Sequence, residues 1–420
     1  MSGRLHHLAN GVRLVCDPMA DLETLAISVV AGRGARTEAA GQSGWAHLLE
    51  HMVFKGAGKR SARDIVEDIE AAGGQINAAT SYERTSFQVR ALKGGLKLGL
   101  EVLADLVLRP TLDAGELERE KLVIEQEIAE AADAPDDRVF DLAQARAFAA
   151  QPLGRPILGE VHTIAQADAE ALREFRAGQY ACDRLVISAA GAIDEDELLA
   201  LAEALFGHEA AVAGPVNATA GFTSGFQAEH RKLEQAHTVL LLPGVGARDE
   251  AYFAQRLFAE ALGGGMSSRL FQEARERLGL AYAIDAYGES YAETGLLGIY
   301  AGTTAENAAR TAEVAARELI ALTSGVQEAE LNRCKAQLKA SLFMSRESTM
   351  ARAEQAAGQV LLFDRLFTTA EIADWVDAVS AADIRAFGTR MLDAKAIAGA
   401  VLGPKPALKA GEVFQRALFG

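Results

Sequence analysis

The chain has 420 residues, of which half are hydrophobic and 24% are charged, and its formal net charge is −16 at pH 7. This length exceeds what one ordinary hydrophobic core supports, so we expect two or more domains. The negative charge argues against nucleic acid and anionic membranes as partners. The cysteines Cys16, Cys182 and Cys334 lie too far apart to indicate a disulfide framework, which favours a reducing compartment.

The first residues, Met1 to Asn10, have no apolar core, so we expect no secretory signal. No stretch approaches the roughly 18 uninterrupted apolar residues that a membrane helix needs. We therefore expect a cytoplasmic protein with no membrane partner.

Short runs rich in apolar and β-branched residues alternate with longer amphipathic stretches in the first half of the chain. Strands are expected over 13–16, 25–30, 76–81, 85–90 and 185–190. Helices are expected over 44–54, 62–72, 96–108, 114–132, 165–177 and 195–206. The helix over 114–132 has Asp113 as its N-cap and Glu116 three residues later, which is a capping-box arrangement. This pattern predicts an α+β fold.

The segment His47-Leu48-Leu49-Glu50-His51 concentrates ionisable groups in an apolar stretch. In a helix His47 and His51 stand at i and i+4, so both imidazoles project from one face and can share a tetrahedral cation. Glu50 lies on the same side, where a carboxylate can take a proton from water. The alternative is a polar surface cluster, but apolar neighbours make such a cluster costly unless it is paired or binds a metal. A third ligand must come from elsewhere in the chain.

The order of elements repeats after a segment over 211–226, which is rich in Gly, Pro, Ser, Thr and Ala and is expected to be a linker. Ala31-Gly32-Arg33-Gly34-Ala35-Arg36 returns as Pro243-Gly244-Val245-Gly246-Ala247-Arg248, a shift of 212 residues. We therefore expect two homologous domains, 1–210 and 227–420. Glu116-Leu117-Glu118-Arg119 recurs as Glu330-Leu331-Asn332-Arg333, at a shift larger by two. The second domain is expected to lack the metal chemistry, because these shifts put Ala259, Leu262 and Gly263 at the positions of His47, Glu50 and His51, and Ser341 at that of Glu127.

Several blocks follow one another along essentially the whole chain: His47-x-x-Glu50-His51, Phe54-Lys55-Gly56, Asn77-Ala78-x-Thr80-Ser81, Glu118-Arg119-Glu120 leading to Glu127, Pro152–Gly159 and Gly263–Leu270. This set resembles the inverted-motif zinc peptidases, the family of pitrilysin and insulin-degrading enzyme. The likeness is closest to the catalytic subunit of the mitochondrial processing peptidase and its bacterial homologues. It implies two homologous α/β-sandwich halves that enclose a chamber, with one zinc ion per chain.

The resemblance implies that His47, His51 and Glu127 hold the zinc. Glu50 would be the general base, drawing a proton from water and later passing it to the leaving amine. Glu120, on the helix face of Glu127, would orient a ligand; the alternative is a solvated helix carboxylate. Manganese or cobalt would suit the same ligands.

The resemblance also implies how substrate binds. The segment 75–81, which contains Asn77 and Ala78, would be an edge strand to which a peptide or unfolded segment adds as an extra strand. Main-chain hydrogen bonds would then hold many sequences in one register.

Further substrate contacts are implied by residues outside that strand. Arg275 and Tyr282 match the family's residues that reach substrate from the second half, and Tyr282 would hydrogen-bond a substrate carbonyl. Asp137 and Asp141 match acidic positions that receive a substrate arginine; the alternative is a pair of surface acids. Because the zinc motif and the Arg275/Tyr282 pair occur in one chain, we expect a homodimer.

These patterns predict a zinc metalloendopeptidase that prefers basic residues near the cut. One alternative is a non-catalytic assembly subunit, as in respiratory-complex core proteins with this fold, and the intact zinc motif argues against it. The other is a catalytic subunit that needs a separate partner chain, and the Arg275/Tyr282 pair argues against that.

Overall fold

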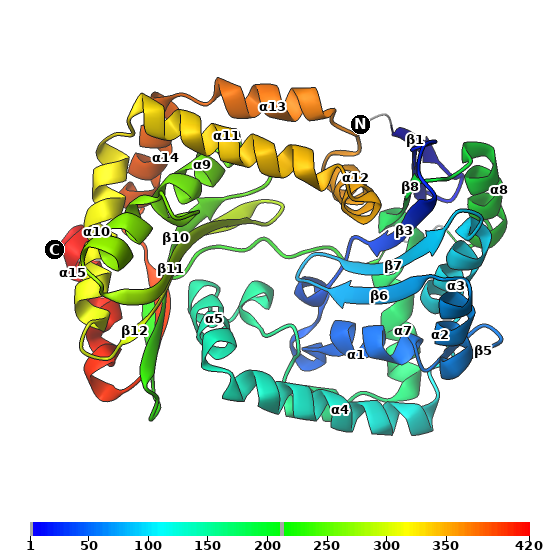
Figure 1. The fold of residues 1–420 in the computed structure, drawn as a ribbon. Helices are drawn as coiled ribbons and strands as arrows, with labels where there is room; N and C mark the ends of the chain where they lie inside the picture. Colours follow the sequence, from blue (N-terminus) through cyan, green and yellow to red (C-terminus); the bar gives the residue numbers. More distant parts are fainter. Residues whose placement is uncertain (1–2, 211–213) are drawn as a thin grey trace. The chain divides into compact units, whose positions relative to one another are not determined.

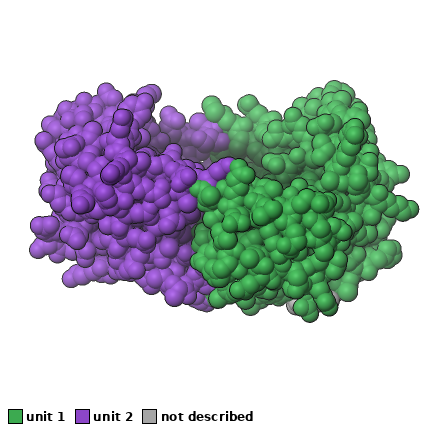
Figure 2. Space-filling model, turned by 90° about the horizontal axis from the view of Figure 1, so that it is seen from below, with its two compact units in different colours: residues 1–129, 156–218, 342–369 green, residues 130–155, 219–341, 370–420 purple. Residues whose placement is uncertain are grey.

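The computed structural model describes residues 3–210 and 214–420, so residues 211–213 of the expected linker lie outside the described residues. It divides the chain into two compact units, which Figure 2 shows in separate colours. The first unit comprises Met1–Ala129, Pro156–Ala218 and Leu342–Thr369, and the second comprises Glu130–Arg155, Thr219–Ser341 and Ala370–Gly420. Among the helices of the described ranges, none is long and apolar enough to cross a membrane.

A six-stranded sheet forms the centre of the first unit. Its strands lie in the order β1 (Arg4–His7), β2 (Arg13–Pro18), β8 (Leu185–Gly191), β3 (Thr24–Ala31), β7 (Thr85–Leu92) and β6 (Gln75–Thr80). The β2/β8 pair is parallel, and the other neighbouring pairs are antiparallel. Since β6 is an edge strand, its outer side presents main-chain groups that this sheet leaves unpaired.

Helices cover both faces of this sheet (Figure 1). Successive residues of the central strands alternate between two separate cores, as with Leu14 and Val15 of β2, so these strands are apolar on both sides. The smaller core is closed by α12 (Thr349–Phe363). The larger core is closed by α1 (Trp45–Val53), α2 (Ala62–Ala71), α3 (Leu96–Leu108) and α8 (Glu195–Phe206), with α6 (Val161–Ala165) and α7 (Ala169–Gln179) against α1.

The second unit repeats this sheet. Its strands lie in the order β11 (Ala281–Ser290), β12 (Thr294–Thr304), β10 (Gln235–Val245), β13 (Ala398–Gly403) and β9 (Gly225–His230), matching β6-β7-β3-β8-β2. The β13/β9 pair is parallel, like β8/β2, and Gly191 and Gly403, both with positive φ, end equivalent strands. The predicted pair of homologous α/β halves is therefore confirmed. The helices of the second unit are α5 (Pro135–Ala147), α9 (Tyr252–Gly263), α10 (Ala308–Ser324), α11 (Glu328–Ser345), α13 (Thr369–Ala378), α14 (Ala381–Asp393) and α15 (Ala410–Phe419).

The two units exchange equivalent helices. α12 comes late in the chain but packs on β2, β3 and β8 of the first unit, whereas α5 comes early and packs on β9, β10 and β13 of the second. Arg352 of α12 is buried and donates to both carboxylate oxygens of buried Asp17, at 2.8 and 2.7 Å. The compact units thus differ from the expected contiguous domains 1–210 and 227–420, because an amphipathic pattern does not specify which sheet will bury a helix.

The starts of α4 (Ala114–Asp133) and α7 are fixed by aspartates that cap the first N–H groups of each helix. Asp113 accepts hydrogen bonds from the N–H groups of Gly115 and Glu116 at the start of α4. The capping-box prediction is only half right, because the Glu116 side chain pairs with Arg119. The helix expected over 165–177 is displaced, since Asp168 caps α7 by accepting from Glu170 and Ala171.

Candidate metal centre

α1 carries His47, Glu50 and His51 on its less buried side. The buried positions of this helix are all apolar or aromatic and recur with helical spacing, which is why the three polar side chains are left together on the opposite face. The buried set is Trp45, Ala46, Leu48, Leu49, Met52 and Val53.

The start of α1 is fixed by contacts distant in sequence. Gly44 has a φ of +89°, and a Cβ there would stand 2.6 Å from the Leu158 carbonyl oxygen, so only glycine fits. The buried carboxylate of Glu38 accepts hydrogen bonds from the N–H groups of Gly44 at 3.0 Å and Ala46 at 2.8 Å. These bonds satisfy N–H groups that a helix start leaves free, and they fix the position of His47 in the first turn.

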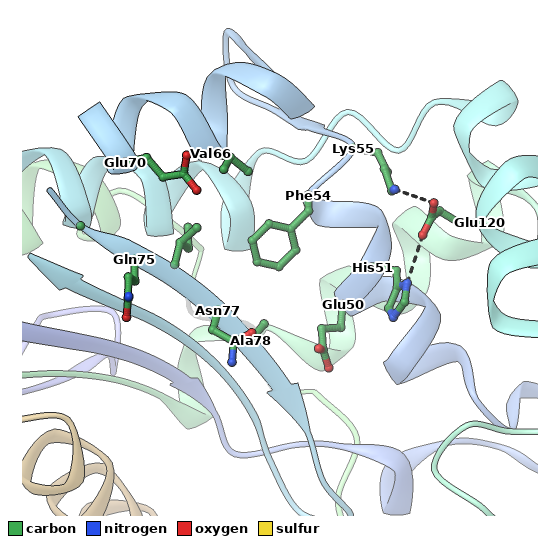
Figure 3. A pocket seen from close by; sticks show the side chains of 12 residues that line it. Glu50, His51, Phe54, Lys55, Val66, Glu70, Gln75, Asn77, Ala78 and Glu120 are labelled. Atoms are coloured by element: carbon green, nitrogen blue, oxygen red, sulfur yellow. Dashed lines mark hydrogen bonds and ion pairs between the residues drawn. The ribbon is translucent and has the colours of Figure 1, made fainter. Parts of the chain in front are cut away.

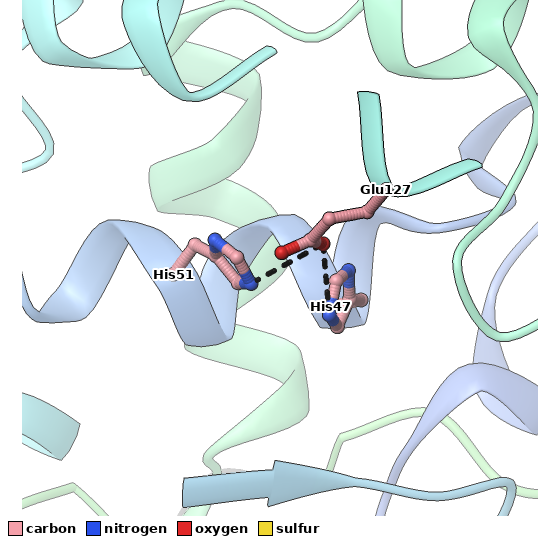
Figure 4. Close-up of side chains that lie close together, drawn as sticks. All are labelled: His47, His51 and Glu127. Carbon is pink, nitrogen blue, oxygen red and sulfur yellow. Dashed lines mark ion pairs between the residues drawn. The ribbon is translucent and has the colours of Figure 1, made fainter. Parts of the chain in front are cut away.

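His47 and His51 of α1 meet Glu127 of α4 (Figure 4). Oε2 of Glu127 lies 3.8 Å from Nε2 of His47 and 3.7 Å from Nε2 of His51. Ligand atoms of a tetrahedral zinc ion, with bonds near 2.0–2.2 Å, stand about 3.3 Å apart. One ligand atom from each of the three residues lies within 4.8 Å of the others, so the group is close enough to hold one metal ion.

The state of these donors suits a metal. Oε2 of Glu127, which faces both imidazoles, is buried and has no hydrogen-bond partner among the described residues. Burial, together with the smaller effect of neighbouring His51, lowers the pKa of His47 to about 4. His47 is therefore neutral at pH 7, the form that ligates metals. Two imidazoles and one carboxylate are the donor set of catalytic zinc sites that keep a position open for water.

Glu120 also reaches this group from α4. Only 4% of Glu120 is exposed, so the solvated-carboxylate alternative does not describe it. Its Oε2 lies 3.0 Å from Nδ1 of His51, and its Oε1 lies 2.5 Å from Nζ of Lys55. Glu120 and Glu127, two helical turns apart, thus both contact His51.

Glu50 lies beside the edge strand. Thr80 of β6 donates a hydrogen bond from Oγ1 to Oε2 of Glu50, at 2.5 Å. Burial raises the pKa of Glu50, and the hydrogen bond from Thr80 opposes this effect. A carboxylate with a raised pKa is a better proton acceptor, which is the property that a general base needs.

A groove of about 640 Å³ runs along β6 within the first unit (Figure 3). Glu50, His51 and Glu120 line one part of it, next to the metal group. The rest of its lining comes from the end of α1, from α2 and from β6: Phe54, Lys55, Val66, Glu70, Gly74, Gln75, Ile76, Asn77 and Ala78. Two expected substrate-binding residues, Asn77 and Ala78, therefore lie beside the candidate base.

The other expected substrate-binding residues belong to the second unit. The Arg275 guanidinium lies 6.0 Å from the ring centre of Tyr282, whose side chain is 77% exposed. Asp137 is exposed on α5, whereas Asp141 is partly buried, and burial raises the pKa of its carboxyl group.

Three residues of the site were not assigned a role from the sequence: Glu38, Lys55 and Thr80. The strand alternation puts Thr80 on the face of Ile76 and Ala78, so that pattern was a usable signal. Lys55 belongs to the block Phe54-Lys55-Gly56, but nothing in the sequence indicates which acidic residue it pairs with. Glu38 precedes α1 by several residues and carries no local capping signal.

The sequence comparisons match both halves to one family. Residues 17–161 match the family model described as insulinase (peptidase family M16), and residues 166–338 match the peptidase M16 inactive domain. A relative from Bacillus subtilis named an uncharacterized zinc protease is 37% identical over 373 residues, covering 88% of this chain and 91% of the relative. A relative from Rickettsia bellii, also named an uncharacterized zinc protease, is 33% identical over 398 residues, which cover 94% of this chain and 96% of the relative.

Solved structures share the fold. A protease from Helicobacter pylori superimposes with a TM-score of 0.89 at 20% identity, covering 96% of this chain and 99% of that one. A chain of complex III2 from Candida albicans superimposes with a TM-score of 0.86 at 19% identity, covering 99% of both chains.

The predicted zinc cofactor is confirmed by the zinc-protease relatives together with the His47/His51/Glu127 group. The family supports a metallopeptidase activity. The two family models together match most of the chain, and the relative from Bacillus subtilis is 37% identical to it. The chain therefore belongs to the insulinase family of peptidases, family M16.

Proposed function

We propose that this protein is a zinc endopeptidase that cleaves peptides or unstructured protein segments bound as an added strand on β6. One observation carries the proposal: within one unit, a three-donor metal group, the partly buried carboxylate of Glu50 and an edge strand adjoin a single groove. Zinc-dependent hydrolysis of a peptide that binds as an added strand requires these three parts close together.

His47, His51 and Glu127 would hold the zinc, which when bound supplies a Lewis acid that acidifies water and polarises the scissile carbonyl. Glu50 would accept the proton of the attacking water and deliver it to the nitrogen of the leaving amine, so its carboxylate is restored after each turnover. Glu120 is a positioning residue, since it contacts His51 rather than substrate.

The main chain of β6 around Asn77 and Ala78 would pair with the substrate backbone. A peptide whose amide nitrogens are methylated at alternating positions should lose cleavage in only one of the two patterns, because alternate N–H groups of an added strand face the sheet. Folded proteins would resist cleavage, since they cannot present an extended strand.

Residues of the second unit would complete substrate binding. We propose that Tyr282 hydrogen-bonds the substrate carbonyl and that Arg275, near its ring, contacts the peptide. Asp137 and Asp141 would receive a basic side chain. The homodimer and the enclosed chamber stay predictions, and gel filtration of the purified chain tests the first of them.

The deciding test is Glu50→Gln, with Glu118→Gln on exposed α4 surface as the matched control. We expect wild type and the control to bind one zinc per chain and cleave a fluorogenic arginine-containing peptide. Glu50→Gln should keep its zinc and lose at least about a thousandfold in kcat. Equal activity of Glu50→Gln and wild type would refute the assigned base.

A second candidate function is that of an assembly subunit, favoured by the fold likeness to a complex III chain over 99% of both chains. It predicts a chain that binds zinc weakly or not at all and cleaves no peptide. A zinc-loaded chain that cleaves only after another protein is added would instead indicate a partner-dependent subunit.

A further inference from the structure

The groove along β6 contains a carboxylate without a cation. Its lining holds three glutamates and one lysine. Lys55 is engaged by Glu120 at 2.5 Å, and Glu50 accepts the hydrogen bond from Thr80. The Glu70 carboxylate has no ion-pair or hydrogen-bond partner among the residues that the structure describes, so the groove carries uncompensated negative charge.

Between the candidate base and Glu70, apolar side chains line the groove beside the polar Asn77 and Gln75 of β6. Phe54, Val66, Ile76 and Ala78 line this stretch. Val66 and Glu70 stand one helical turn apart on α2, so both side chains face the groove from the same helix (Figure 3). The groove therefore offers an apolar path with a negative charge at its far end.

We infer that this stretch of the groove is a subsite for a lysine or arginine side chain of the substrate, with Glu70 as its specificity-determining residue. The aliphatic stem would lie along Phe54 and Val66 while the cationic head reaches Glu70, as long basic side chains do at amphipathic surfaces. A guanidinium would also gain from the Phe54 ring. This inference rests on the proposed function, because it assumes that the peptide lies along β6.

Strand alternation restricts which substrate residue enters. Ile76, Ala78 and Thr80 share the inward face of β6, and the side chains of an added strand alternate in the same way. Glu50 contacts Thr80 at one end of β6, whereas Gln75 at the other end lines the groove. At about 3.3 Å per residue, the basic side chain belongs to a residue within about five positions of the scissile bond.

The solvent exposure of Glu70 limits how strongly the subsite can prefer a basic side chain. Glu70 is exposed, so an ion pair with it should raise the affinity for a basic side chain by at most about fivefold. A norleucine side chain would contact the same apolar walls and lack the charge. Comparing lysine with norleucine thus isolates the contribution of Glu70.

The test measures binding without turnover. Fluorescence anisotropy would report the Kd of the zinc-loaded Glu50→Gln chain for pairs of peptides. The two peptides of a pair would differ only by lysine or norleucine at one position, and the pairs would cover each of about five positions on either side of the cleaved bond. We expect a preference of about fivefold for lysine at one position. Adding Glu70→Gln should abolish it, and adding Glu70→Lys should turn it into a preference for norleucine, because the introduced ammonium repels the lysine side chain.

Glu67→Gln, also on exposed α2 and paired with Arg63, is the matched control and should leave the preference unchanged. Equal binding of both peptides at every position overturns the inference, as does a preference that survives Glu70→Gln. If Asp141→Asn removes a preference that Glu70→Gln leaves, the acids of α5 recognise the basic residue instead. Charge-selective binding without cleavage by wild type would overturn the endopeptidase proposal alone, and cleavage without charge preference would overturn this inference alone.

Discussion

Oε2 of Glu120 accepts a hydrogen bond from Nδ1 of His51, with 3.0 Å between the two atoms. An ionised carboxylate can only accept, so Nδ1 carries the proton and Nε2, the atom that faces Glu127, is left free to ligate. The other oxygen of Glu120 lies 2.5 Å from Lys55 Nζ. The ammonium of Lys55 thus supports a nearly buried carboxylate that orients a metal ligand.

Lys55→Met should weaken zinc binding about tenfold, because Glu120 would lose its cation and its fixed orientation toward His51. Competition with a chromophoric chelator measures this change without any assay of activity. Lys97→Met is the control, because the Lys97 side chain is 67% exposed and forms a weak surface pair with Glu101, with 4.0 Å between Nζ and Oε1. Unchanged zinc affinity in Lys55→Met would show that Glu120 needs no support from Lys55.

Thr80→Val should shift the acidic limb of the pH–rate profile to higher pH. The Thr80 hydrogen bond stabilises ionised Glu50 and lowers its pKa against the raising effect of burial, so its removal raises the pKa. Because the reaction uses ionised Glu50, activity would then be lost at a higher pH as the solution is acidified. Thr80→Ser keeps the hydroxyl and should keep the wild-type profile; an unshifted limb in Thr80→Val would argue against Glu50 as the base.

Removal of zinc should lower the thermal unfolding midpoint as well as abolish activity. A ligand that binds only the native state at a thousand times its Kd adds about 4 kcal/mol to the free energy of unfolding. Calorimetry before and after chelation, and after zinc is restored, measures the effect. Glu127→Ala should unfold at nearly the same temperature with and without zinc, and a zinc-dependent midpoint in that variant would place the ion elsewhere.

Arg352→Met should lower the free energy of unfolding by about 3–5 kcal/mol, because buried Asp17 would lose the guanidinium that neutralises it. Urea unfolding measures the loss. Breaking the exposed Arg390–Asp249 pair with Arg390→Met should cost about 1 kcal/mol or less. If both variants lose equally little, the buried pair does not hold α12 to the sheet.

The spacing of residues along the chain predicted many of the helices and strands and most of the metal-binding group. The spacing of His47, Glu50 and His51 within an apolar run determined both the helix and the face that bears the chemistry, since helical periodicity operates within a few residues. The 212-residue repeat predicted two halves with one strand order, which the sheets of both units share. The resemblance supplied Glu127, and the structure brings it to both histidines.

Other features depended on packing between distant segments. No local pattern indicates that Glu38 caps α1, that Lys55 supports Glu120, or that Glu70 ends the groove. Nor does the sequence indicate that α5 and α12 are exchanged, because each helix has an apolar stripe that either sheet would accept. The sequence by itself therefore determined the elements, their repeat and the metal-binding motif. Only the tertiary structure decided which distant side chains meet around that motif, because those contacts depend on how the whole unit packs.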